Sequence, residues 1–297
     1  MPPIPPPSAE GVTTTTALPL YWCRYDAPQP KGTLVLLHGG PGAHLDYLLP
    51  QMLELARHHD VLLYDQRGGG RSKTDDRTPI TWHTQVEDLA AVLAELHDGP
   101  VTLVGYSWGA MLAMLYAIEA AAGRVAPAPD RLVLISPAPL NRSWRAEFEA
   151  TFSARQTGPA VTAMRAELQA SGLRESDPEA YKQRSFELSV AGYFADPSRV
   201  HDLTPFRVTG RVQQSIWESL GDFDLRDALR TLRIPALVVH GRQDPIPLAS
   251  AQACAAALGA ESLWLDDCGH VPYVEQPARL FAAVEDFLAR TASSLGP

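Results

Sequence analysis

The fold is decided by residues 100–118, PVTLVGYSWGAMLAMLYAI, which combine a short apolar run, a tight turn and a longer apolar segment. Pro100–Gly105 predicts a buried strand, and Ala110–Ile118 predicts a buried helix. Between them, Gly105 and Gly109 flank a single serine in the pattern G-x-S-x-G. Glycines at both positions let the strand and the helix approach each other closely, as a strand-to-helix turn that exposes its serine requires.

Runs of the same kind recur on both sides of this stretch. We predict further strands at residues 33–37, 60–65, 131–135, 235–240 and 262–265, and amphipathic helices at 89–96 and 277–290. Strands that are apolar on both faces and alternate with helices predict a mostly parallel central sheet flanked by helices on both sides. The predicted fold class is therefore α/β.

The alternation is interrupted once, between residues 140 and 226. This part has no clear strand, and it has helical periodicity at 144–152, 161–168, 179–190 and 212–220. We predict a helical cap subdomain, residues 140–226, inserted into one core domain made of residues 18–139 and 227–297. Before the core we expect a Pro-rich lead-in, residues 1–17, whose first seven residues are disordered or polyproline II and do not resemble a signal peptide.

Composition places the chain among globular proteins, since its 297 residues are 45% hydrophobic and 20% charged, with a formal net charge of −9. An acidic surface is a poor partner for nucleic acid or an anionic membrane, and no apolar run approaches the roughly 18 residues of a membrane span. Cys23, Cys254 and Cys268 show neither disulfide nor zinc-site spacing. We therefore expect three packed thiols, no metal, no cofactor and a cytoplasmic protein.

Ser107 is the candidate nucleophile. It would lie at the carboxyl end of the sheet and at a helix N-terminus, where developing negative charge is favoured. A serine hydroxyl needs a base, and only His240 and His270 follow the cap. His240 ends a predicted strand and is expected to be structural, whereas His270 lies in the loop after the last predicted strand, from which it could reach the serine.

The acid that orients this histidine is predicted at Asp244, shortly after the strand that ends at His240 and on the same sheet edge as the serine. Asp266 and Asp267 are the alternatives. They stand so close to His270 in the sequence that a fixed Asp–His hydrogen bond is harder to build. We therefore expect Asp244 to complete a catalytic triad with Ser107 and His270.

Stabilisation of an oxyanion requires N–H donors. We predict the backbone N–H of Trp108, which follows the nucleophile, and that of Gly40 in the Gly-rich segment His38–Gly42. The alternative for such a segment is phosphate binding. This one lacks the Lys-Ser/Thr ending of a P-loop and the spacing of a dinucleotide site.

Three motifs occur in order along the chain: HGGPG at 38–42, DQRGGGRS at 65–72 and GYSWG at 105–109. Together with Asp244 and His270 they resemble the proline iminopeptidase family of α/β-hydrolases, over roughly residues 18–138 and 234–290. The resemblance implies an α/β-hydrolase fold with a helical cap and cofactor-free removal of an N-terminal residue, often proline, from short peptides. Residues 65–72 are expected to shape the turn beside the active site. Glu275-Gln276-Pro277 also recurs in relatives, where we expect the proline to start a helix.

An enzyme that acts on a free N-terminus must also hold the ammonium group, and a carboxylate does this best. In the family, acids of the cap serve that purpose, and in the archaeal relatives a glutamate directly follows the catalytic aspartate. Pro245 occupies that position here. The substrate-binding candidates are Glu187 and Glu218, each of which follows an aromatic residue.

These observations predict a cytoplasmic serine aminopeptidase that releases N-terminal proline or small apolar residues from short peptides. The alternative is a carboxylesterase or related acyl hydrolase with the same triad, which the missing glutamate at position 245 favours. A non-catalytic binding protein on the same fold is a third hypothesis, and the intact triad argues against it. Epoxide hydrolases and dehalogenases have an aspartate where Ser107 stands.

Overall fold

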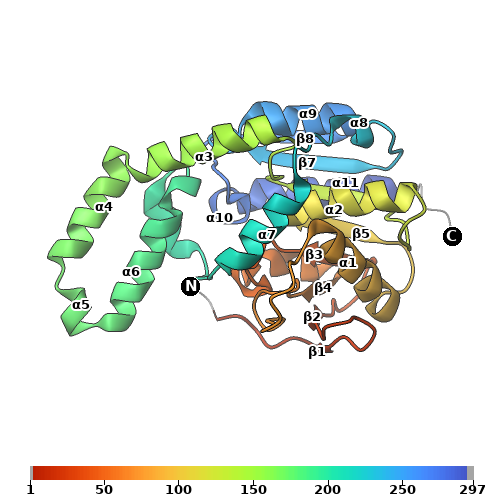
Figure 1. Ribbon diagram of the computed structural model, residues 1–297, viewed down its shortest axis with the longest axis horizontal. Coiled ribbons are helices and arrows are strands. Elements are labelled where there is room, and N and C mark those ends of the chain that lie inside the picture. The colour runs from red at the N-terminus through yellow and green to blue at the C-terminus, as the bar shows by residue number, and fades with distance from the viewer. Residues whose placement is uncertain (1–2, 293–297) are drawn as a thin grey trace.

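A computed structural model describes residues 3–292 of the chain. Its centre is an eight-stranded sheet with the strand order β1-β2-β4-β3-β5-β6-β7-β8 (Figure 1). β1 pairs with β2, and β2 with β4, in antiparallel fashion, while every other pairing is parallel. The strands are β1 (Ala9–Val12), β2 (Tyr21–Tyr25), β3 (Thr33–Leu37), β4 (Asp60–Tyr64), β5 (Thr102–Tyr106), β6 (Arg131–Ile135), β7 (Ala236–Gly241) and β8 (Glu261–Leu265).

Alternate residues of the central strands supply two separate cores, one on each face of the sheet. In β3, Val35 and Leu37 pack in the core that includes α1 (Trp82–Leu96), α2 (Trp108–Ala121) and α9 (Leu248–Leu258). Leu34 and Leu36 pack in the other core, with the 3₁₀ helix η2 (Gln51–Arg57), α10 (Pro272–Glu275) and α11 (Pro277–Ala292). The predicted α/β fold with a mostly parallel, helix-flanked sheet is confirmed.

The segment between β6 and β7 is helical, as predicted. It contains α3 (Arg142–Gln156), α4 (Pro159–Ala170), α5 (Leu173–Ser176), α6 (Pro178–Val190), η3 (Ala191–Tyr193), η4 (Pro197–Asp202), α7 (Gly210–Leu220) and α8 (Arg226–Leu229). Figure 1 shows α4, α5 and α6 extending away from the sheet as an arm, whereas α7 crosses beside α1 and α2. Local signals start these helices: Asn141 and Asp177 accept backbone N–H groups as N-caps, and Pro178 opens α6.

The structure differs from the expectation for residues 1–17. Ala9–Val12 form β1, the outer strand of the sheet, so this part of the lead-in belongs to the core domain. An edge strand with one solvated side needs no apolar alternation, and Val12 is 55% exposed. Pro3–Pro7 have no regular secondary structure, and the first two residues of the predicted lead-in lie outside the described ones.

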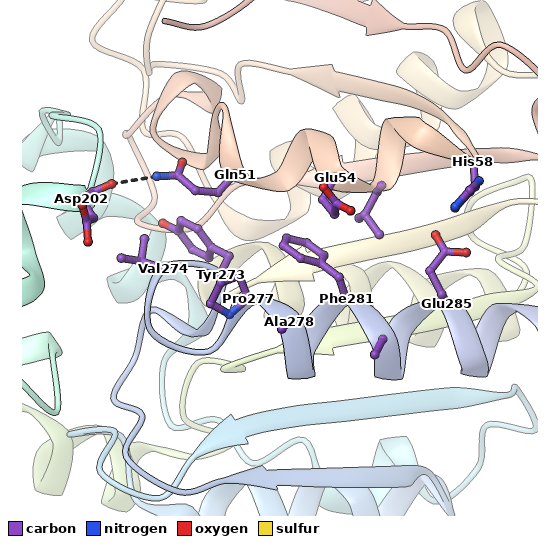
Figure 2. Close-up of a pocket in the computed structure, with 12 residues that line it drawn as sticks. Gln51, Glu54, His58, Asp202, Tyr273, Val274, Pro277, Ala278, Phe281 and Glu285 are labelled. Carbon is purple, nitrogen blue, oxygen red and sulfur yellow. Dashed lines mark hydrogen bonds between the residues drawn. The ribbon is translucent and has the colours of Figure 1, made fainter. Parts of the chain in front are cut away.

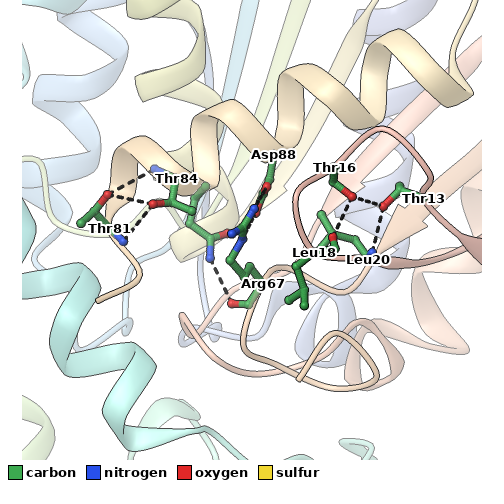
Figure 3. A network of polar contacts seen from close by, with 9 residues as sticks. Thr13, Thr16, Leu18, Leu20, Arg67, Thr81, Thr84 and Asp88 are labelled. Carbon is green, nitrogen blue, oxygen red and sulfur yellow. Dashed lines mark hydrogen bonds and ion pairs between the residues drawn. The ribbon is translucent and has the colours of Figure 1, made fainter. Parts of the chain in front are cut away.

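A polar network fixes the segment after β4 to α1 (Figure 3). Arg67 donates from Nε to Asp88 Oδ2 at 2.8 Å, and Thr81 and Thr84 form a capping box at the start of α1. Burial raises the pKa of the Asp88 carboxyl, and the hydrogen bonds from Arg67 oppose that rise. The network therefore holds the 65–72 motif in place from outside the site.

The three cysteines pack as predicted. Cys23, Cys254 and Cys268 are all buried with free thiols. Burial raises the pKa of Cys23 and Cys254 to about 12, so both thiols stay protonated near neutral pH. Within residues 3–292, no helix has the length and apolar character that a membrane crossing requires.

Candidate active site

Ser107 lies in a sharp turn between β5 and α2, at the carboxyl end of the sheet. Its backbone has φ 54° and ψ −115°, in the region that non-glycine residues rarely adopt. A Cβ at Gly105 would overlap the backbone of Gly109, and one at Gly109 would overlap the carbonyl group of Leu37. Both glycines are therefore needed for the strand, the serine turn and the helix to pack at this distance.

The structure brings the three predicted triad residues together. His270 Nε2 lies 3.0 Å from Ser107 Oγ, and His270 Nδ1 lies 2.8 Å from Asp244 Oδ2. Asp244 follows β7 and His270 follows β8, so three strand ends supply the three side chains. Asp244 and His270 are 7% and 5% exposed, and the other carboxylate oxygen of Asp244 accepts the N–H of Ile246 at 2.7 Å. This arrangement holds the histidine between the acid and the serine.

The two alternative acids lie elsewhere. Asp266 is exposed and pairs with Arg242 at 2.9 Å, and Asp267 is exposed as well. His240 is fully buried: its Nε2 lies 3.1 Å from the carbonyl oxygen of Ile246, and its Nδ1 lies 3.6 Å from Asp244 Oδ2. Burial lowers the pKa of His240, which keeps its imidazole neutral. This is consistent with the structural role expected for His240.

Gly40 and Trp108, the two predicted oxyanion donors, both lie close to Ser107. Gly40 has φ +55° and lines the pocket that contains Ser107, and Trp108 is the first residue of α2. Within residues 3–292, neither backbone N–H has a hydrogen-bond partner. The neighbouring N–H of Gly39 donates to the Tyr47 hydroxyl at 2.6 Å and is not available. Gly40 and Trp108 therefore each have an unoccupied N–H group that could donate to an oxyanion at Ser107.

Gln66 joins these two segments. Its side-chain amide donates to the carbonyl oxygen of His38 at 2.7 Å and accepts from the Trp108 indole N–H at 3.0 Å. Its backbone N–H donates to His38 Nε2 at 3.0 Å. The Asp65 carboxylate in turn accepts the backbone N–H groups of Leu45 and Arg71. The 65–72 motif, whose glycines and arginines were expected to shape the turn beside the active site, contacts the two segments through Gln66.

The pocket beside Ser107 is compact and largely aromatic. Its volume is about 340 Å³. It is lined by Gly40, Tyr47, Tyr106, Ser107, Phe152, Phe186, Ser189, Val190, Tyr193, Leu203, Phe206, Val208, Gln213, His270, Val271 and Tyr273. None of these residues carries a carboxylate. The pocket fits a small apolar acyl group better than a charged one.

Glu187 and Glu218 do not reach this pocket, and their predicted role as substrate-binding acids is not supported. Glu187 is buried on the far side of α6, where its Oε2 pairs with Arg184 at 2.9 Å and lines a separate cavity of about 650 Å³. Glu218 is exposed and accepts from Gln214 at 2.7 Å. The aromatic neighbour of Glu187, Phe186, does line the pocket. Consecutive helical residues point about 100° apart, so the next side chain is turned away.

Two further features bear on ligands. No cluster of three or more His, Cys, Asp or Glu side chains suited to a metal ion occurs among residues 3–292. A cavity of about 580 Å³ lies between η2 and α11 (Figure 2). Among residues 3–292, Tyr273, whose ring is buried, is the one lining residue that it shares with the Ser107 pocket. Phe281 lies at the centre of the cavity, with Glu54 and Glu285 along its sides.

Glu275 is a buried residue whose contacts the sequence analysis missed. One carboxylate oxygen accepts the N–H of Gly269, next to His270, at 2.8 Å, and the other accepts the N–H of Ala195 in the cap at 2.7 Å. The N–H of His270 itself donates to the carbonyl oxygen of Tyr193 at 2.7 Å. Burial raises the pKa of Glu275, and the backbone donors counter this rise. The carboxylate thus ties the histidine loop to the cap, and its place five residues after His270 was the only sequence signal.

We expect Glu275→Gln to lower kcat about 10- to 100-fold. The amide N–H₂ group of glutamine would face a backbone N–H donor, which would loosen the loop that carries His270, and small displacements of a catalytic group reduce the rate strongly. Steady-state kinetics and melting temperature should be measured together. Glu285→Gln, the same change on α11 beside His59 and away from the His270 loop, is the control and should keep its kcat. A Glu275→Gln protein with normal kcat and a lower melting temperature would show that the residue serves stability alone.

Four features together define a class of protein: the sheet order, the serine turn, the aligned side chains of the site and the helical insertion. The chain belongs to the alpha/beta hydrolase family, whose characteristic sequence matches residues 34–284.

Named relatives place it near one group within that family. A curated proline iminopeptidase of Lactobacillus delbrueckii subsp. bulgaricus is 26% identical over 270 residues, which are 87% of this chain and 90% of that protein. The crystal structure of proline iminopeptidase from Mycobacterium smegmatis has a TM-score of 0.69 at 20% identity, covering 96% of this chain and 99% of that one. The enol-lactonase of Burkholderia xenovorans LB400 has a TM-score of 0.64 at 22% identity, covering 94% and 100%. At these identities the two structures show a shared fold, so the substrate must be inferred from the pocket.

Proposed function

We propose that this protein is a serine hydrolase that releases a compact apolar acyl group from its substrate through an acyl-enzyme. The observation that carries the proposal is the alignment of Ser107, His270 and Asp244 at the floor of a small aromatic pocket. The proposed substrates are short peptides with N-terminal proline or another small apolar residue, or small acyl esters. The reaction needs no cofactor, and the reduced, buried thiols support a cytoplasmic location.

The proposed reaction assigns a residue to each step. Ser107 Oγ bonds to the substrate carbonyl carbon while its proton passes to His270 Nε2. The N–H groups of Gly40 and Trp108 stabilise the resulting oxyanion. When the carbonyl re-forms, the bond to the leaving group breaks and the leaving group takes the proton from His270. Water then repeats the sequence on the acyl-enzyme, with His270 as base, and restores Ser107.

The aminopeptidase activity is supported by the named relatives and by pocket size. A proline or alanine side chain fits a 340 Å³ pocket lined by rings such as Phe152, Phe186 and Phe206. Its ammonium group would have to be held by Ser189, Gln213 and the aromatic faces, since no carboxylate lines the described pocket.

That uncharged lining favours a second candidate, a carboxylesterase for small apolar acyl groups. Burying an ammonium group beside neutral partners costs more than burying an uncharged acyl chain of the same size. The two candidates share the triad and differ only in the charge of the group that enters the pocket.

A matched substrate panel separates them. We expect the aminopeptidase to cleave proline and alanine 4-nitroanilides and to lose that activity when the substrate amine is acetylated, because the free amine is part of what it recognises. The carboxylesterase would cleave 4-nitrophenyl propanoate and butanoate and leave both anilides intact. Failure to hydrolyse any of these compounds would contradict the serine hydrolase proposal itself.

A further inference from the structure

A wide surface groove adjoins the Ser107 pocket. Its volume is about 1110 Å³, and it shares four lining residues with the pocket: Phe186, Ser189, Phe206 and Val208. Two of them, Phe206 and Val208, lie on the segment between η4 and α7, and the other two lie on α6. This shared wall makes the groove the candidate place for the leaving group of a substrate whose acyl group occupies the pocket.

The two other large cavities near the cap and α11 offer no such path. The cavity in Figure 2 shares only Tyr273 with the Ser107 pocket, and that ring is 1% exposed. The cavity that contains Glu187 shares no lining residue with it. Among these cavities, the groove is the one whose wall continues into the pocket.

The groove is positively charged although the chain as a whole carries −9. Lys73, Lys182 and Arg207 line it, and Glu179 is the only carboxylate among its described lining residues. Glu179 pairs with Lys182 at 2.6 Å. Lys73 and Arg207 have no acidic partner within residues 3–292, so two cations face the groove without compensation.

We propose that the groove binds a carboxylate on the leaving group of the substrate. The proposal rests on the proposed serine hydrolase function and adds that the leaving group carries a negative charge. In the peptide case the carboxylate is the free C-terminus of a di- or tripeptide, and in the ester case it is an acid group on the alcohol. Arg207 supplies a planar fork that suits a carboxylate, and Lys73 supplies a second positive charge. The uncharged pocket and the cationic groove then divide the substrate into an apolar acyl part and an anionic leaving part.

Two pairs of compounds test this under either candidate activity. The members of each pair are close in size and differ in the charge of the leaving group: 3-carbamoyl-4-nitrophenyl against 3-carboxy-4-nitrophenyl butanoate, and Pro-Ala amide against Pro-Ala. We expect kcat/KM to be about three- to tenfold higher for the anionic member at low salt, as partly solvated charge pairs allow. The preference should decline in 0.5 M NaCl, because the groove is open to solvent.

The double variant Lys73→Ala/Arg207→Ala should reduce the preference to about one while the neutral ester keeps its kcat/KM. Lys31→Ala removes one positive charge beside Glu285, outside the groove, and should leave the preference unchanged. Equal kcat/KM for both members of each pair in the parent protein, or a preference that survives the double variant, would overturn the inference and leave the hydrolase function standing. If no member of either pair is hydrolysed, the proposed function fails and the inference fails with it.

Discussion

Ser107→Ala should lower kcat roughly 10⁴- to 10⁶-fold on whichever substrate proves active, since it removes the atom that forms the acyl-enzyme. The protein should fold normally. The side chain contributes one hydrogen bond, to His270 at 3.0 Å, and alanine adds no volume to the turn. Alanine has to adopt the same positive φ at residue 107 as serine does, so the backbone strain is unchanged. We therefore expect the free energy of unfolding to change by no more than about 1 kcal/mol.

Labelling with a fluorophosphonate gives an independent measurement. The parent protein should be labelled on a single serine, and Ser107→Ala should not be labelled at all. Ser171→Ala, at the exposed end of α4, is the matched control and should keep both labelling and turnover. Substantial turnover by Ser107→Ala would rule out this residue as the nucleophile, and labelling at another serine would point to a different site.

Gly109→Ala should destabilise the protein by about 3–4 kcal/mol, because the added methyl group overlaps the backbone of Leu37 and His38 in β3 and in the loop that follows it. Backbone atoms of a central strand cannot move aside as a flexible side chain can. The melting temperature should fall by about 6–12 °C. Activity should fall as well, because any retreat of α2 from β3 moves Ser107 and the N–H of Trp108 together.

Gly210→Ala is the control for this change. Gly210 is the first residue of α7, and a Cβ there would meet no atom within 4 Å. Alanine at this position should be neutral or stabilising by up to about 1 kcal/mol, since it restricts the unfolded chain more than glycine does. If both alanine variants melt at the parent temperature, the close packing of α2 on β3 is not what fixes the serine turn.

Strand and helix positions were predictable where the pattern is local. The run before Ser107, the helix after it and the four long cap helices were all found close to their predicted residues. β1 and β2 were missed because they pair at the edge of the sheet in antiparallel fashion, where one side of the strand can face solvent. β1 pairs with β2, which is close to it in the sequence, whereas β2 pairs with β4, which lies much further along the chain, and no short window of sequence records that second pairing.

The same division holds for the site. Three site residues, Ser107, Asp244 and His270, each follow the end of a strand. Their positions after strand ends therefore predicted that they would meet at one edge of the sheet. Glu187 and Glu218 were selected from sequence neighbours alone, and helix rotation directs both away from Ser107. Glu275 was overlooked because its partners, Gly269 and Ala195, come from two loops that only the folded chain brings together.

The sequence by itself determined the α/β class, the inserted helical cap, the position of the serine turn and the residues that align with it. These follow from apolar periodicity and turn chemistry, which act over a few residues. Only the tertiary structure decided which side chains line the pocket, that no carboxylate is among them, and that cations line the groove beyond it. Those properties depend on how the cap packs over the sheet, and that packing is set by contacts between residues far apart in the chain.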